Sequence, residues 1–130
     1  MSASFFQALC PLDVRDISTD VDKPKFRLLA DYVIRHNLLD DSSVQILTVP
    51  RGFETDFGSI PDALKGITPA VSDLDGLYTF HDYLYTFHHS YTRGNVDSAL
   101  RRGWILFGIP RWKAWIAYYG VRAKAGSHWK

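Results

Sequence analysis

The segment His81-Asp82-Tyr83-Leu84-Tyr85 places an imidazole, a carboxyl and a phenol close together in the chain. Neighbouring residues of a helix point about 100° apart, so His81 and Asp82 can serve two different partners at one site. Tyr85 follows His81 by four residues and would share its face of the helix. Side chains of these types could activate water by general base catalysis.

A second carboxyl, Asp97, lies in the next predicted helix after a short connection. If the two helices pack antiparallel, Asp97 comes level with His81. A buried carboxylate there would fix the tautomer of the imidazole and support its action as a base. Asp82 would then be free to take a hard cation, with backbone carbonyls supplying further oxygens. The alternative is that His81 and Asp82 only satisfy neighbouring backbone groups.

The high density of Gly and Pro in residues 50–76 predicts an ordered loop, with a short helix near Pro61–Lys65. Asp56 is of a type that hydrogen-bonds nearby backbone in tight turns. Asp56 and the carbonyls of this loop could face the histidine site, which makes Asp56 a second candidate metal ligand. Alternatively, the loop is a rigid turn that packs Phe53 and Phe57 into the core, and both interpretations can hold at once.

The remaining elements follow from local composition. Residues 1–24 have no clear period and are expected to form an irregular N-terminal arm. Residues 25–35 and 44–49 are rich in β-formers, which predicts a β-hairpin around a polar turn at 37–43. The alternation in 26–35 is imperfect, so a helix is the alternative there.

Three helices are predicted in the C-terminal half, at about 73–88, 93–107 and 110–124, from apolar residues spaced three and four apart. The expected fold is therefore a single α+β domain over residues 25–130, preceded by the arm. We expect His36 and His128 to be exposed. The third helix carries large apolar side chains at helical spacing, which favours packing in the core: Trp112, Trp115, Ile116 and Tyr119.

The chain has 130 residues and a net charge of +1, but its charges are unevenly distributed. All 14 Asp and Glu lie in residues 1–97 together with eight Lys and Arg, which leaves that stretch at −6. Residues 98–130 carry seven Lys and Arg and no acid. This division indicates either attraction within the molecule or a charged partner. The basic, tryptophan-rich end could also stack on nucleic-acid bases or lie on an anionic membrane.

Several function classes are disfavoured. A single cysteine, Cys10, excludes an internal disulfide framework and fits a reducing compartment. The sequence begins without the pattern of a signal peptide, and its apolar stretches are far shorter than the ~20 residues of a membrane span. We therefore expect neither a secreted nor a membrane-spanning protein. Zinc ligands at workable spacing, a nucleophile elbow and a phosphate-binding glycine loop are not found either.

Three ordered motifs support a first resemblance. Residues 26–122 resemble a family of small bacteriophage and prophage proteins of uncharacterised function. The resemblance implies a phage origin and little about chemistry. The motifs that carry it are Thr55-Asp56-Phe57-Gly58-Ser59-Ile60-Pro61, His81-Asp82-Tyr83-Leu84-Tyr85, and Arg93 with Asp97.

A shorter stretch resembles the catalytic helix of calcium-dependent secreted phospholipases of the A-two type, in which His-Asp-x-x-Tyr follows an Asp-x-Leu-Asp-like entry. Carried over, the resemblance implies that His81 activates water, that Asp82 holds calcium, and that Asp97 with Tyr85 orients His81. Calcium would polarise the ester carbonyl. The match departs from the family in its calcium loop, for which Gly52 and Gly58 are a loose substitute, and in its missing cysteines, with Leu84 standing where one is expected.

Two functions follow from these observations. The first is a bacteriophage virion or assembly component of the tail or baseplate type, forming oligomers with other phage structural proteins. The second is a phage-encoded, metal-assisted hydrolase of an ester in lipid or the cell envelope. The expected location is the virion or the host cytoplasm, with no specific nucleic-acid partner.

Overall fold

The computed structural model describes residues 3–20, 22–39, 43–56, 71–124, 126 and 129, leaving aside the side chains of residues 71–73 and 124. The described residues form six strands and three helices, with the helices in the C-terminal half, as expected for the α+β class. The elements are β1 (Phe6–Ala8), β2 (Val14–Asp16), β3 (Phe26–Leu28), β4 (Tyr32–His36), β5 (Gln45–Val49), β6 (Glu54–Thr55), α1 (Val71–Thr86), α2 (Arg93–Leu106) and α3 (Arg111–Lys124).

The strands form two small antiparallel sheets, with orders β1-β4-β5 and β2-β3-β6. The predicted hairpin is confirmed for β4 and β5, in which Tyr32 lies opposite Val49 and both side chains are buried. The run of β-formers at 25–35 does not form one strand, however. It turns after Leu28, so that β3 and β4 belong to different sheets.

The N-terminal segment contributes a strand to each sheet. β1 pairs with β4, and β2 pairs with β3. The ring of Phe6 packs edge-on against Phe80 and Phe107, with centroid distances of 5.5 and 6.0 Å. The expectation of an irregular arm is therefore wrong for β1 and β2, because three-residue strands are too short to show a period of two.

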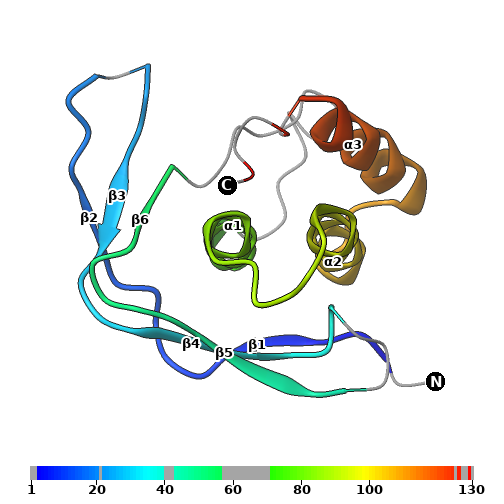
Figure 1. The fold of residues 1–130 in the computed structure, drawn as a ribbon, viewed down its shortest axis with the longest axis horizontal. Coiled ribbons are helices and arrows are strands. Elements are labelled where there is room, and N and C mark those ends of the chain that lie inside the picture. The colour runs from blue at the N-terminus through cyan, green and yellow to red at the C-terminus, as the bar shows by residue number, and fades with distance from the viewer. Residues whose placement is uncertain are drawn as a thin grey trace.

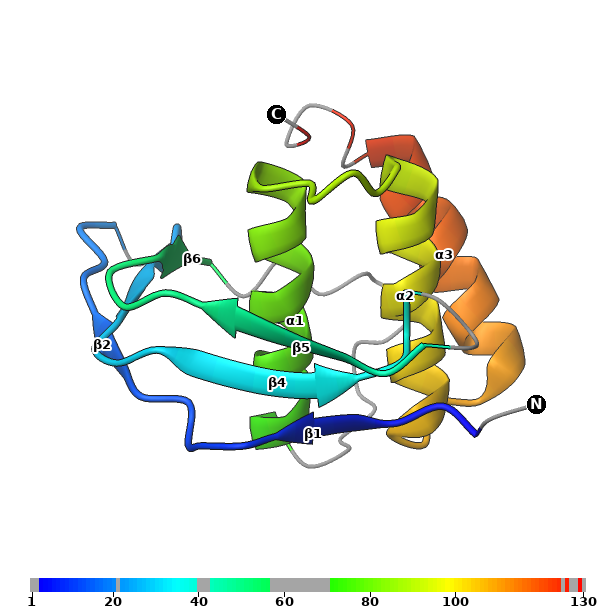
Figure 2. The ribbon, with the colours of Figure 1, turned by 60° about the horizontal axis from the view of Figure 1, so that its bottom comes forward.

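The helices cover one face of the β1-β4-β5 sheet (Figures 1 and 2). α1 and α2 lie side by side and antiparallel above this sheet, and α3 packs against α2 on the side away from the sheet (Figure 1). Between them, α1 and α2 supply the two largest fully buried side chains of the core, Phe80 and Trp104. They also supply Leu77, Leu84 and Val96.

The ends of α2 follow from its sequence. Thr92 caps the first turn and forms a reciprocal capping box with Asn95. After the helix, Gly108 has a φ of +98°, a left-handed conformation that favours glycine, and Pro110 precedes α3. These signals explain why α2 and α3 match their predicted ranges closely. α1 begins at Val71, slightly earlier than predicted, and the short helix predicted near Pro61–Lys65 lies outside the described residues.

The large apolar side chains of α3 do not pack in the core, and this corrects the expectation drawn from their spacing. Trp112, Trp115, Ile116 and Tyr119 are 63%, 40%, 53% and 63% exposed. The opposite side of α3 is the buried one, and its buried residues are the small Ala114 and Ala117.

His36 is also placed differently from the expectation, because it is buried in β4 rather than exposed. Its Nδ1 accepts a hydrogen bond from the backbone N–H of Leu38 at 3.1 Å, and its ring meets Phe80 edge-on. Its buried Nε2 has no hydrogen-bond partner among the described residues. Burial lowers the pKa of His36 to about 4, so the ring is neutral at physiological pH.

Candidate functional site

The helix pair brings His81 and Asp97 together, as predicted from their spacing. The Nε2 atom of His81 on α1 lies 2.9 Å from the Oδ1 atom of Asp97 on α2. The hydroxyl of Tyr85, one turn after His81, donates to the same Oδ1 atom at 2.5 Å. Asp97 is 1% exposed, so this carboxylate is held within the protein between the two helices.

Two arginines complete the surroundings of Asp97. Arg122 of α3 donates from Nη1 to the Oδ2 atom of Asp97 at 3.2 Å, and Arg93 forms an ion pair with the same oxygen at 3.7 Å. Arg93 also donates to the hydroxyl of Tyr85 and to the carbonyl of Val121, which ties the end of α3 to the site. Neither arginine was predicted from the sequence to take part in the site.

The Asp97 carboxyl is ionised at neutral pH. Burial by itself raises the pKa of Asp97, but hydrogen bonds from His81, Tyr85 and Arg122, together with the charge of His81, lower it below its ordinary value. An ionised carboxylate only accepts hydrogen bonds, so the Nε2 atom of His81 must carry the proton of this contact. A neutral imidazole in this position therefore has its lone pair on Nδ1.

The Nδ1 atom of His81 is available to a substrate or a water molecule. Within the described part of the chain, the hydrogen bonding of His81 is limited to Nε2. The side chain of His81 is 10% exposed, so the ring keeps some contact with solvent. A histidine with one nitrogen on a buried carboxylate and the other free is arranged as a general base.

Asp82 points to a different partner from His81, as the helical spacing predicts. Its Oδ2 atom accepts a hydrogen bond of 2.5 Å from the hydroxyl of Thr55, at the end of β6. Asp82 also hydrogen-bonds the side chain and the backbone of Asp56. Asp56, the residue directly after β6, thus contacts Asp82, which neighbours His81 in the chain, while the rest of the predicted loop lies outside the described residues.

Burial raises the pKa of Asp82 to about 7. The hydrogen bond from Thr55 lowers the pKa and the negative charge of Asp56 raises it, but both effects are smaller than that of burial. Two carboxyls on adjacent elements therefore share this position, and one of them holds its proton well above the ordinary range. A hard cation between them would favour the ionised form of both.

Asp82 and Tyr85 both line a cavity of about 540 Å³ between α1 and the β2-β3-β6 sheet. Thr55 and Asp56 line it as well, whereas His81 does not. The ring of His81 lies beside that of Tyr85, which is one of the lining residues, with a centroid distance of 4.4 Å. The described residues contain no group of three or more His, Cys, Asp or Glu side chains that could hold a metal ion.

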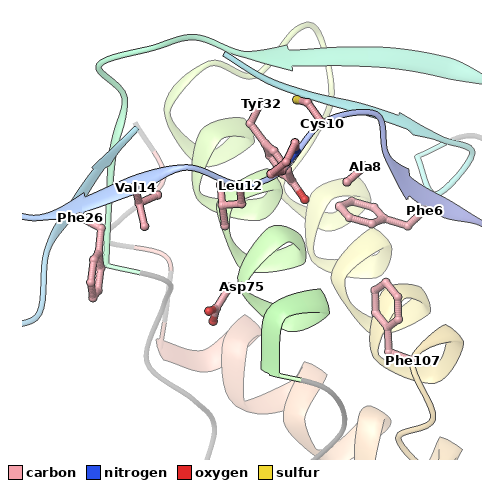
Figure 3. Close-up of a pocket in the computed structure, with 10 residues that line it drawn as sticks. Phe6, Ala8, Cys10, Leu12, Val14, Phe26, Tyr32, Asp75 and Phe107 are labelled. Atoms are coloured by element: carbon pink, nitrogen blue, oxygen red, sulfur yellow. The ribbon is translucent and has the colours of Figure 1, made fainter. Parts of the chain in front are cut away.

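A second cavity, of about 640 Å³, is less suited to catalysis (Figure 3). Its lining is apolar apart from Cys10 and the hydroxyl of Tyr32, and Asp75 of α1 is its charged residue. The thiol of Cys10 is engaged by the backbone, since it donates to the carbonyl of Asp31 and accepts from the N–H of Val33. No base and acid meet across this cavity, so we place the candidate site at His81 and Asp97.

A family model described as Protein of unknown function (DUF1353) matches residues 26–121. The chain belongs to this family. The matched range begins with β3 and ends in α3, so it contains His81, Asp82, Tyr85, Arg93 and Asp97, whereas Arg122 lies one residue beyond it. No curated protein and no solved structure matches the chain. No helix among the described residues is long and apolar enough to cross a bilayer.

Proposed function

We propose that this protein is a hydrolase in which His81 activates water as a general base. The observation that carries the proposal is the arrangement of the two ring nitrogens of His81. Nε2 lies 2.9 Å from a buried, ionised carboxylate, while Nδ1 has no hydrogen-bond partner among the described residues and the side chain is 10% exposed. This leaves the lone pair of a neutral imidazole where water can donate a proton to it.

The proposed reaction is the hydrolysis of an ester. Nδ1 of His81 takes a proton from water, and the oxygen of that water attacks the carbonyl carbon. The C–O bond of the tetrahedral intermediate then breaks, and the leaving alkoxide takes the proton from Nδ1, which yields an acid and an alcohol. Asp97 stabilises the imidazolium that forms between these steps, and Tyr85, Arg93 and Arg122 hold Asp97 in place.

Asp82 and Asp56 would hold a calcium ion in this proposal. Their oxygens, together with the hydroxyl of Thr55, are donors of the hard type that calcium prefers. When bound, calcium would polarise the carbonyl of the ester and stabilise the negative charge on its oxygen. The resemblance of the His81 to Tyr85 segment to calcium-dependent phospholipases supports an ester of lipid or cell envelope as the substrate class.

The direct test replaces the proposed base. His81→Gln should retain the fold and lower the rate of ester release from phospholipid or envelope substrates by at least about a hundredfold. The matched control is His89→Asn, which changes an exposed histidine whose φ of +49° suits asparagine. Equal rates for wild type and His81→Gln, with calcium present and with calcium chelated, would refute the proposal.

A virion or assembly component is the second candidate, and the β1-β4-β5 sheet favours it. β5 is an edge strand in the described sheet, and Val44 and Ile46 expose 53% and 65% of their surface beside that edge. Such an edge can pair with a strand of another phage structural protein. The resemblance to phage proteins supports a location in the virion or the host cytoplasm for this role. Mass spectrometry of purified particles of a phage that encodes the chain tests it.

A further inference from the structure

We propose that the outer face of α3 binds the surface of an anionic lipid bilayer. This face consists of Trp112, Trp115, Ile116 and Tyr119, which recur at the spacing of one helical stripe. All four are exposed by 40% or more. The proposal concerns peripheral binding and does not depend on the hydrolase activity of His81.

The residue types of the outer face are those of a membrane interface. Three of its four side chains are Trp or Tyr, which combine an apolar ring with a polar group and favour the boundary between lipid tails and water. The ring of Tyr119 lies 5.8 Å from that of Trp115, so the aromatic surface is continuous along the helix. A single apolar residue on a surface needs no explanation, whereas a contiguous stripe of this kind indicates a partner.

Positive charges surround the outer face. Arg101 of α2 stacks on Trp115 with its guanidinium 4.0 Å from the ring, and the amino group of Lys113 lies 5.2 Å from the ring of Trp112. Helical geometry places Arg111 along the edge of the stripe that Trp115 occupies. Residues 98–130 contain no Asp or Glu. The charge around the stripe is therefore complementary to an anionic surface.

The same charges argue against the simplest alternative, a twofold contact between α3 helices of two copies. Such a contact would bring the cations of the two chains together around an apolar seam, and like charges at an interface oppose association. Among the described residues, Arg101, Arg111 and Lys113 form no ion pair that would neutralise them. An anionic lipid bilayer matches both features of this face, because its apolar interior can take up the aromatic side chains and its headgroups attract the cations around them.

The test measures binding of the full chain to vesicles of phosphatidylcholine with and without phosphatidylglycerol, by cosedimentation and by tryptophan emission. We expect binding that requires phosphatidylglycerol, weakens with added salt, and shifts the emission of the exposed Trp112 and Trp115 to shorter wavelength. Ile116→Ser with Tyr119→Ser keeps both reporters and should lower the partition coefficient by about tenfold or more. Arg111→Gln should lower it about fivefold.

Matched controls separate this face from the rest of the surface. Ile46→Ser removes an equally exposed apolar side chain from β5, and Arg51→Gln removes an exposed cation far from α3 in the chain. Both should bind vesicles as wild type does, and so should His81→Gln. The proposal is overturned by equal binding of the α3 variants, by absence of binding, by self-association that Ile116→Ser with Tyr119→Ser abolishes, or by oligonucleotide binding through these residues in preference to vesicles.

Discussion

At the scale of single residues, the candidate site depends on one buried carboxylate with four partners. His81 and Tyr85 contact one oxygen of Asp97, and Arg93 and Arg122 contact the other. A buried charge is costly unless it is paired and hydrogen-bonded, and here both oxygens are satisfied. The carboxylate can therefore stay ionised while it holds His81 in a single orientation.

The pKa values of two carboxyls shift in opposite directions: Asp97, which is hydrogen-bonded to His81, and Asp82, which follows His81 in the chain. The pKa of Asp97 lies below its ordinary value, whereas burial raises the pKa of Asp82 to about 7. Environments that push the pKa values of nearby groups apart are typical of sites that perform acid and base chemistry. The contrast follows from the surroundings, because burial dominates at Asp82, whereas at Asp97 the hydrogen bonds from His81, Tyr85 and Arg122 and the charge of His81 outweigh burial.

The raised pKa of Asp82 has a consequence for stability. Between about pH 4 and pH 7, the folded protein holds a proton on Asp82 that the unfolded chain has released, so the free energy of unfolding decreases as pH rises through this window. Asp82→Asn removes this pH-dependent loss of stability, and the amide oxygen of the asparagine can still accept the hydrogen bond from Thr55. We expect this variant to be more stable than wild type at pH 8, by on the order of 2 kcal/mol, with little difference below pH 4.

Urea denaturation at a series of pH values measures this effect as the difference between the variant and wild type. Subtraction is essential, because burial lowers the pKa of His36 to about 4 and gives a slope of opposite sign between about pH 4 and pH 6.5. That contribution is the same in both proteins and cancels. A difference between Asp82→Asn and wild type that does not change with pH would contradict the assignment.

At the scale of elements, the helices were predictable where local signals mark their ends. Thr92 and Gly108 bound α2, and Pro110 precedes α3. The buried side of α3 was not predictable from hydrophobicity, because the spacing of large residues identifies a stripe but not what it faces. Ala114 and Ala117 form the buried side, and small residues permit close approach of helices. The side of α3 that packs against the protein is therefore the one with the small residues and not the one with the large apolar residues.

Close packing between α1 and α2 leads to a prediction about Gly103. A Cβ atom at this position would lie 2.5 Å from Cδ1 and 3.1 Å from Cγ of Leu77, whose side chain is completely buried. Leu77 cannot yield without disturbing the core, so overpacking should outweigh the better helix propensity of alanine. We expect Gly103→Ala to lower the free energy of unfolding by about 1–2 kcal/mol in urea denaturation.

Gly120→Ala in α3 is the matched control for this prediction. A Cβ atom at Gly120 would have no atom within 4 Å, so only the gain in helix propensity applies. That variant should be stabilised by up to about 1 kcal/mol. If Gly103→Ala were stabilised to the same extent as Gly120→Ala, the packing of Leu77 against α2 would not be as tight as the structure shows.

At the scale of the whole molecule, the part of the site within one helix pair was predictable, and the rest was not. His81, Tyr85 and Asp97 lie within two consecutive helices, so spacing and an antiparallel turn suffice to bring them together. Arg93 was accessible to the same reasoning, because it precedes Asp97 by four residues. Arg122 and Thr55 come from distant elements, and only the tertiary fold brings them to the helix pair.

The N-terminal segment provides the last prediction, because it tests whether residues 25–130 form an independent domain. β1 and β2 each contribute a strand to one of the two sheets, and Phe6 packs against the helices through Phe80 and Phe107. Removing residues 1–24 would expose the edges of β4 and β3 and leave a cavity beside Phe80. We therefore expect the deletion to lower the thermal midpoint markedly and to broaden the unfolding transition.

Two point variants distinguish a role in the fold from a role in assembly alone. Phe6→Ala removes the half-buried ring and should lower the free energy of unfolding by about 2 kcal/mol, whereas Leu9→Ala changes a side chain that is 48% exposed and should cost less than about 0.5 kcal/mol. Calorimetry of dilute protein separates the two roles, since a midpoint set by assembly depends on concentration and one set by the fold does not. An unchanged midpoint after deletion of residues 1–24 would show that the two N-terminal strands are dispensable, because the energy of the fold would then reside in β4, β5 and the three helices.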